Sequence, residues 1–223
     1  MDTILDEMFK AGVHFGYSRS SRHPSMKPVI YGTKNRTEII NLEKTNEHLN
    51  IVKELLKGLA LGGKTILFVG TKNEARDAVK NAADLINMPY VNERWVGGIF
   101  TNFSEIKKRI ARMKDLIDKK AKGELDVYTK KERLILQWEQ ERLEKLFGGL
   151  TDMTEKPAII FVVDPKKEKI AVAEARKMGV PVIALMNTDC QFKDADYPIP
   201  GNDASVASIQ FVLSQLVSAY RNK

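Results

Sequence analysis

Short segments that are apolar from end to end, each followed by a helical pattern, constrain this chain most. Residues 66–69 and 159–163 contain no polar side chain, and 182–185 is a third segment of this kind. Each is of strand length and too short for a buried helix. The helical patterns that follow them span 73–86, 166–178 and 205–220. Apolar strands that alternate with amphipathic helices are typical of a parallel sheet covered on both faces. We therefore predict an α/β fold, a doubly wound and mostly parallel sheet sandwich.

The N-terminal part predicts a smaller unit beside this sheet. A short helix is expected over 3–11, ending at Gly12, and a loop rich in basic and small residues follows over 17–24. Two extended pieces, 29–31 and 38–40, flank the turn-forming residues 32–36. This pattern predicts a β-hairpin whose loop carries Lys34 and Arg36.

Between residues 103 and 150 about half of the side chains are charged, and the apolar ones form narrow seams. The first seam is Phe103, Ile106, Ile110, Met113 and Ile117, and the second is Leu136, Gln140, Leu143, Phe147 and Leu150. The alternating spacing of three and four residues is that of a coiled coil.

Local signals bound the second of these helices. Thr129 and Glu132 have the spacing of a capping box that would start it, and Gly148 would end it. We predict an antiparallel coiled-coil hairpin over 103–150, inserted into a sandwich domain made of 1–102 and 151–223. The alternative is two ordinary surface helices packed flat on the sheet.

The balance of charges favours a polyanionic partner. The 223 residues include 36 Lys and Arg against 29 Asp and Glu, a net charge of +7. The single cysteine, Cys190, excludes an internal disulfide and fits a reducing compartment. No uncharged run approaches the ~18 residues of a membrane span. The acidic first residues do not resemble a secretory signal, so we expect a cytoplasmic protein without a membrane partner.

One motif matches a phosphate-binding loop in letters but not in context. Residues 58–65 read Gly-Leu-Ala-Leu-Gly-Gly-Lys-Thr. A phosphate-binding loop follows a strand and opens a helix, which directs free backbone N–H groups at the phosphates. Here a helical pattern precedes the motif and the strand 66–69 follows it, so we reject nucleotide binding at this motif.

An enzyme remains the rival interpretation. The carboxyl ends of parallel strands are the usual ligand crevice, and Thr71, Lys72, Asp164 and Asp189 are expected at that edge, where a phosphorylated metabolite could bind. The same aspartates are more simply read as residues of helix caps and turns. His14, His23 and His48 are scattered without metal-ligand spacing, so we expect no metal and no cofactor.

Segment 93–103 is the most specific part of the sequence, and within it we expect Trp95 in the core and Arg94 pointing outward. It belongs to a set of short motifs that occur in order along the whole chain. The motifs are Gly12-Val13-His14-Phe15-Gly16, Met26-Lys27-Pro28, Ile39-Ile40-Asn41-Leu42-Glu43-Lys44-Thr45, Phe68-Val69-Gly70-Thr71-Lys72, Arg94-Trp95-Val96-Gly97-Gly98 and Asp196-Tyr197-Pro198-Ile199-Pro200-Gly201-Asn202-Asp203. Together they resemble the family of bacterial small-subunit ribosomal protein two. Tyr17 and Asn187 depart from that family's usual histidine and aspartate.

The resemblance implies a non-enzymatic protein of the small ribosomal subunit, in the cytoplasm. It implies a sheet domain with a protruding coiled coil that lies between the head and body of the subunit. The implied partners are small-subunit rRNA and neighbouring ribosomal proteins, including ribosomal protein one where it is present. A pure protein adaptor, whose hairpin alone binds partners, is a weaker alternative.

The residues expected to contact RNA are cations in loops and at helix ends, because these positions lack helical acid partners. Such contacts are mostly independent of sequence and follow the A-form backbone. They comprise Arg19, Arg22, Lys27, Lys34, Arg36, Lys72, Arg94, Lys107, Lys108, Arg109 and Arg112.

Overall fold

The computed structural model describes residues 3–221, so the outermost ends of the predicted sandwich domain, 1–2 and 222–223, lie outside it. A five-stranded parallel sheet forms the centre, in the spatial order β5-β4-β6-β7-β8. Its strands are β4 (Ile66–Val69), β5 (Tyr90–Val91), β6 (Ile159–Val163), β7 (Val182–Met186) and β8 (Tyr197–Pro200). The prediction of an α/β fold with a parallel sheet is confirmed.

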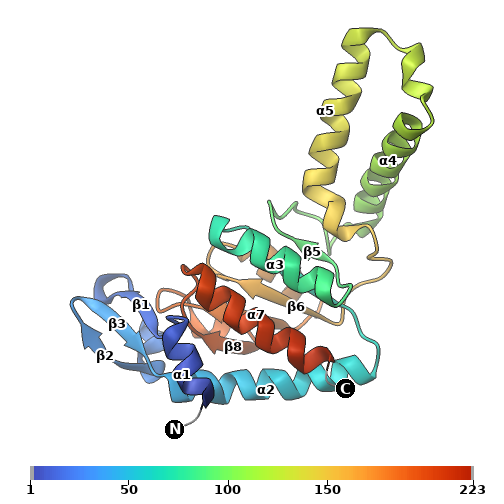
Figure 1. Ribbon diagram of the computed structural model, residues 1–223. Coiled ribbons are helices and arrows are strands. Elements are labelled where there is room, and N and C mark those ends of the chain that lie inside the picture. The colour runs from blue at the N-terminus through green and yellow to red at the C-terminus, as the bar shows by residue number, and fades with distance from the viewer. Residues whose placement is uncertain (1–2, 222–223) are drawn as a thin grey trace.

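Helices cover both faces of this sheet, because both faces are apolar. One face presents Phe68, Phe161 and Leu185 to a layer of three helices, α2 (Leu42–Leu61), α3 (Asn73–Leu85) and α7 (Val206–Arg221) (Figure 1). The other face presents Leu67 and Val162 to α6 (Lys169–Lys177) and to the segment around Trp95. No helix within residues 3–221 is long and apolar enough to span a bilayer.

A separate antiparallel sheet lies at the N-terminal side. It follows helix α1 (Thr3–Lys10) and has the order β1-β3-β2, from β1 (Phe15–Ser18), β2 (Ile30–Lys34) and β3 (Thr37–Ile40). The predicted hairpin β2–β3 is present, but its turn has two residues rather than five, because Asn35 (φ 49°) and Arg36 (φ 64°) both adopt the left-handed conformation. Left-handed residues at both positions are typical of the tightest hairpin turns.

Several boundaries differ from those predicted. Strand β1 was not predicted, and its last two residues fall in the expected loop 17–24. Strand β8 was not predicted either, because its two prolines suggest irregular structure. An edge strand tolerates proline because one side of it needs no donor. Helix α6 begins at Lys169 rather than at 166, since the backbone N–H groups of Lys166 and Lys167 donate to Asp164 Oδ1 (3.1 Å each) and form a turn.

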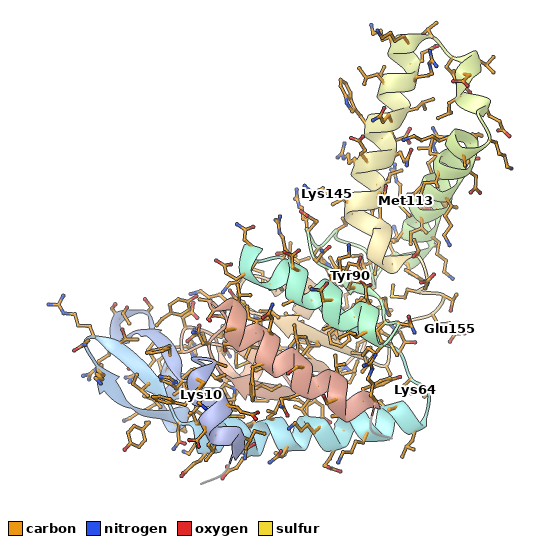
Figure 2. The ribbon with its side chains drawn as sticks, in the orientation of Figure 1. Lys10, Lys64, Tyr90, Met113, Lys145 and Glu155 are labelled. Carbon is orange, nitrogen blue, oxygen red and sulfur yellow. The ribbon has the colours of Figure 1, made fainter. Side chains whose placement is uncertain are left out.

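Two helices project beyond the sandwich and lie side by side (Figure 1). They are α4 (Phe103–Ala121) and α5 (Lys130–Phe147), and the predicted capping box of Thr129 and Glu132 is present at the start of α5. Ile106, Ile110 and Met113 are buried as predicted. Figure 2 labels Met113. The seam then continues through Leu116, which is 1% exposed, and not through Ile117, which is 36% exposed.

The base of the helix pair belongs to the core of the sheet. Leu143, Phe147 and Leu150 form one apolar cluster with Val69 and Trp95. Gly149 makes the closest approach, since a Cβ atom there would lie 2.4 Å from the Tyr90 carbonyl oxygen of strand β5. Figure 2 labels Tyr90 beside the base of the helix pair.

The neighbouring glycines 148 and 149 give a matched test of this approach. We expect Gly149→Ala to lower the free energy of unfolding by about 2 kcal/mol, because its methyl group must displace backbone. Gly148→Ala meets only the Glu144 side chain, at 3.7 Å, and is expected to be neutral. Denaturant unfolding measures both, and equal stability of the two variants would contradict the contact.

The corrected seam gives a second matched pair. Leu116→Ala removes fully buried apolar volume and is expected to cost about 3 kcal/mol of unfolding free energy. Ile117→Ala, one residue later and exposed, is expected to change it by less than about 0.5 kcal/mol. Thermal or denaturant melts of the two variants check that Leu116→Ala costs more stability than Ile117→Ala. A larger cost for Ile117→Ala would mean that the helix buries Ile117, as the sequence pattern predicted.

Candidate nucleic-acid interface

The N-terminal sheet brings several of the predicted cations together. Arg19 is exposed, and its backbone N–H donates to the Arg36 carbonyl (3.4 Å), which places the basic loop against the β2–β3 turn. Lys34 and Arg36 are exposed at that turn, and Lys27 is exposed in the 3-10 helix Pro24–Val29, which precedes β2. These four side chains form no ion pair within residues 3–221, so their charges face solvent.

Arg22 is placed differently from its neighbours. Its guanidinium is 25% exposed and bonds at 2.9 Å to the carboxylate of Glu38, which is fully buried. An unpaired buried carboxylate is costly, so this pair stabilises the sheet. The remaining N–H groups of a partly exposed guanidinium can still donate to a phosphate.

Lys72 does not lie with the exposed cations. Its side chain is 13% exposed, and its Nζ lies 2.6 Å from Asp164 Oδ2 and 2.7 Å from Asp203 Oδ2. Burial lowers the pKa of the Lys72 ammonium, but the two carboxylates outweigh it and raise the pKa above its ordinary value. Because its charge is neutralised inside the protein, the expected RNA contact at Lys72 lacks a geometric basis.

The rest of the strand-end edge is also paired internally. Glu168 is buried, and its Oε1 accepts hydrogen bonds from the backbone N–H of Thr71 (3.1 Å) and from the Thr71 hydroxyl. Lys166 pairs with Asp189 at 2.8 Å. Asp164 accepts the backbone N–H groups of a turn and Asp189 lies in another turn, as the simpler interpretation predicted. The described residues contain no cluster of three or more His, Cys, Asp or Glu side chains able to hold a metal ion.

The segment before α4 combines a buried aromatic with an exposed cation, as predicted. Trp95 is 6% exposed and meets Phe100 edge to face, with 5.3 Å between the ring centroids, whereas Arg94 is exposed. The Glu174 carboxylate of α6 fixes the turn, since it accepts from the backbone N–H groups of Gly98 (2.7 Å) and Phe100 (3.1 Å). Gly98 has a φ of 100°, which only glycine adopts readily.

Some of the predicted cations of α4 form ion pairs with acidic side chains and others do not. Lys107 lies 5.0 Å from the centroid of the Phe103 ring, and Arg109 is exposed. Lys108 pairs with Glu105 at 2.6 Å, and Arg112 pairs with Glu139 of α5 at 3.1 Å. The expectation that these cations lack helical acid partners is therefore wrong for Lys108 and Arg112.

The predicted residues form two groups rather than one surface. The first lies on the N-terminal sheet, and the second comprises Arg94 and cations in the first half of α4, at the root of the projecting helix pair. In Figure 1 the N-terminal sheet and this part of α4 lie apart from each other. Sequence reasoning did not predict that Thr188, Asn187, Asp203 and Glu174 organise these groups. Asp203 and Asn187 carried a signal through their places in the family motifs, but no spacing rule relates Asp203 to Lys72, 131 residues away.

Comparison with known proteins agrees with the resemblance noted above. The family model described as ribosomal protein S2 matches residues 8–222. Curated relatives include the small ribosomal subunit protein uS2 of Helicobacter hepaticus, 44% identical over 96% of this chain and 81% of the relative. The proteins of the same name from Wolinella succinogenes and Geotalea uraniireducens are each 43% identical over 96% of this chain, covering 79% and 84% of their own lengths.

The buried carboxyl of Glu168 predicts a pH-dependent stability. Burial raises the pKa of Glu168, against the lowering effect of the bonds from Thr71. A group whose pKa is higher in the folded state stabilises the fold at low pH, and that contribution is lost as the pH rises through the folded pKa. We expect the unfolding free energy of the wild type, relative to Glu168→Gln, to fall as the pH rises above about 4.5. Denaturant titrations from pH 4 to 7 check this, and a constant difference would contradict it.

Proposed function

The chain belongs to the ribosomal protein S2 family, and from this premise we propose that it is a structural protein of the small ribosomal subunit. The match over residues 8–222 is the observation that carries the proposal. The proposed role is to bind rRNA between the head and body of the subunit, in the cytoplasm, and to support translation without catalysis.

We assign the RNA contacts to the predicted cations that are exposed or partly exposed. The electrostatic reason is that each phosphate contact releases condensed counterions, which makes binding strong at low salt and nearly independent of sequence. Lys72 is left out because Asp164 and Asp203 neutralise it. The proposed contact residues are Arg19, Arg22, Lys27, Lys34, Arg36, Arg94, Lys107, Lys108, Arg109 and Arg112.

We further propose that α4 and α5 form a coiled-coil hairpin, and that 103–150 is an insertion into a sandwich domain of 1–102 and 151–223. The buried seam of Ile106, Ile110, Met113 and Leu116 supports the coiled coil. The same family membership suggests contacts with neighbouring ribosomal proteins and docking of ribosomal protein one where it is present.

The ion pairs at the carboxyl ends of the strands argue against the rival proposal of an α/β enzyme. A phosphorylated metabolite at that edge would need cations free of acidic partners, but Lys72 and Lys166 each bond an aspartate within 2.8 Å. Of the described lysines there, only Lys167 forms no ion pair, and its Nζ lies 3.5 Å from the Thr71 carbonyl. A phosphate there would also meet the carboxylates of Asp164, Asp189 and Asp203.

Sedimentation in a sucrose gradient separates the two proposals. A structural protein of the subunit is expected to travel with small subunits at moderate salt, whereas an enzyme would stay near the top of the gradient. A chain that remains free when small subunits are intact would contradict the proposed function.

Filter binding to small-subunit rRNA across a salt series tests the contacts. We expect the double variant Lys34→Ala, Arg36→Ala to reduce the slope of log affinity against log salt by about 2, roughly 1 for each phosphate contact. Lys80→Ala, which removes an exposed cation of α3 outside the proposed set, is the control and is expected to keep the wild-type slope. A wild-type affinity that does not vary with salt would overturn the electrostatic proposal.

A further inference from the structure

The basic loop between Tyr17 and His23 is held at both ends by one residue, Thr188. The backbone N–H of Tyr17 donates to Thr188 Oγ1 (3.0 Å), and the backbone N–H of His23 donates to the Thr188 carbonyl (2.8 Å). Gly16 lies so close that a Cβ atom there would be 2.7 Å from Thr188 Cγ2. Besides the bonds of Arg19 to Arg36 and of Arg22 to Glu38, the loop is therefore fixed at both of its ends by one buried threonine.

Thr188 is in turn fixed by a chain of buried polar contacts that ends at Lys72. Its backbone N–H donates to Asn187 Oδ1 (2.7 Å), and Asn187 Nδ2 donates to Asp203 Oδ1 (3.0 Å). The other oxygen of Asp203 bonds the Lys72 ammonium at 2.7 Å. Thr188, Asn187 and Asp203 are at most 1% exposed, so water cannot replace these partners.

We propose that Lys72 is a positioning residue for RNA binding, which acts through Asp203, Asn187 and Thr188 on the loop carrying Arg19 and Arg22. This inference rests on the proposed function. Without the ammonium, Asp203 becomes a buried and uncompensated carboxylate, which the fold relieves by rearranging the contacts of Asn187 and Thr188. A loop released from Thr188 must then be ordered on binding, which lowers the affinity.

The first experiment compares rRNA affinity among charge-matched variants of the whole chain. Lys72→Met is expected to weaken binding about tenfold, the scale expected when a few side chains must be ordered on binding. Lys72→Arg keeps the cation and is expected to restore most of the affinity. Lys166→Met is the control, because it removes an equal charge from an exposed ion pair at the same sheet edge. It is expected to leave the affinity unchanged.

A double-mutant cycle distinguishes positioning from direct contact. In a background with Arg19→Ala, Arg22→Ala and Glu38→Gln, the last of which removes the buried charge that Arg22 neutralises, the positioning role predicts that Lys72→Met causes little further loss of affinity. A full additional loss would mean that Lys72 contacts RNA itself, and would overturn the inference.

Hydrogen exchange provides a readout that does not need RNA. Lys72→Met is expected to accelerate exchange of the Tyr17 and His23 amides while the β6 amides keep their protection. Uniform acceleration would mean a general structural role and would overturn the inference. If Lys72→Met does not fold, Thr188→Val, which removes only the acceptor for Tyr17, is expected to weaken RNA binding and to speed exchange at Tyr17 in the same way.

The failure of the inference and the failure of the proposed function are distinguishable. A wild-type chain that does not bind rRNA would defeat the proposed function, and exchange at Tyr17 and His23 would still decide whether Lys72 orders the loop. A wild-type chain that binds, with Lys72→Met binding equally well, would defeat the inference alone.

Discussion

The structure depends on a parallel sheet that is apolar on both faces. All the residues of β4, β6 and β7 are buried, so the chain must supply two separate covers. Helices α2, α3 and α7 cover one face. The other is covered by α6 and by the segment around Trp95 together with the base of the α4–α5 pair. The projecting helices are therefore rooted in the core of the sheet rather than attached to its surface.

The parts of this fold that could be predicted from the sequence are those in which the local spacing of apolar residues matches the burial found in the structure. The strands β4 and β6 and the capping box at Thr129 are set by residues close together in the chain, and each was predicted. Strand β1 was not predicted, because its four residues, Phe15–Ser18, include a glycine and are too few for a clear alternating pattern, and they become a strand only against β3. The shift from Ile117 to Leu116 reflects a helix whose buried face is set by its partner.

The candidate site was less predictable than the fold, for an electrostatic reason. Sequence shows how many cations a chain has, but not which carboxylates fold against them. Lys72 and Asp203 are 131 residues apart in sequence and 2.7 Å apart in space, and Arg22 is similarly paired with the buried Glu38. The side chains that expose positive charge are therefore fewer than the formal excess suggests, and they lie in two separate groups, on the N-terminal sheet and at the root of α4.

Gly149 has a mechanical consequence. It lies against the carbonyl of Tyr90 in the edge strand β5, two residues after α5 ends, where no side chain would fit. The 18 residues of α5 extend about 27 Å from this point, at 1.5 Å per residue. Because the base of α5 shares its apolar cluster with Val69 and Trp95, a sideways load on the far end of the helix would act on the core of the sheet.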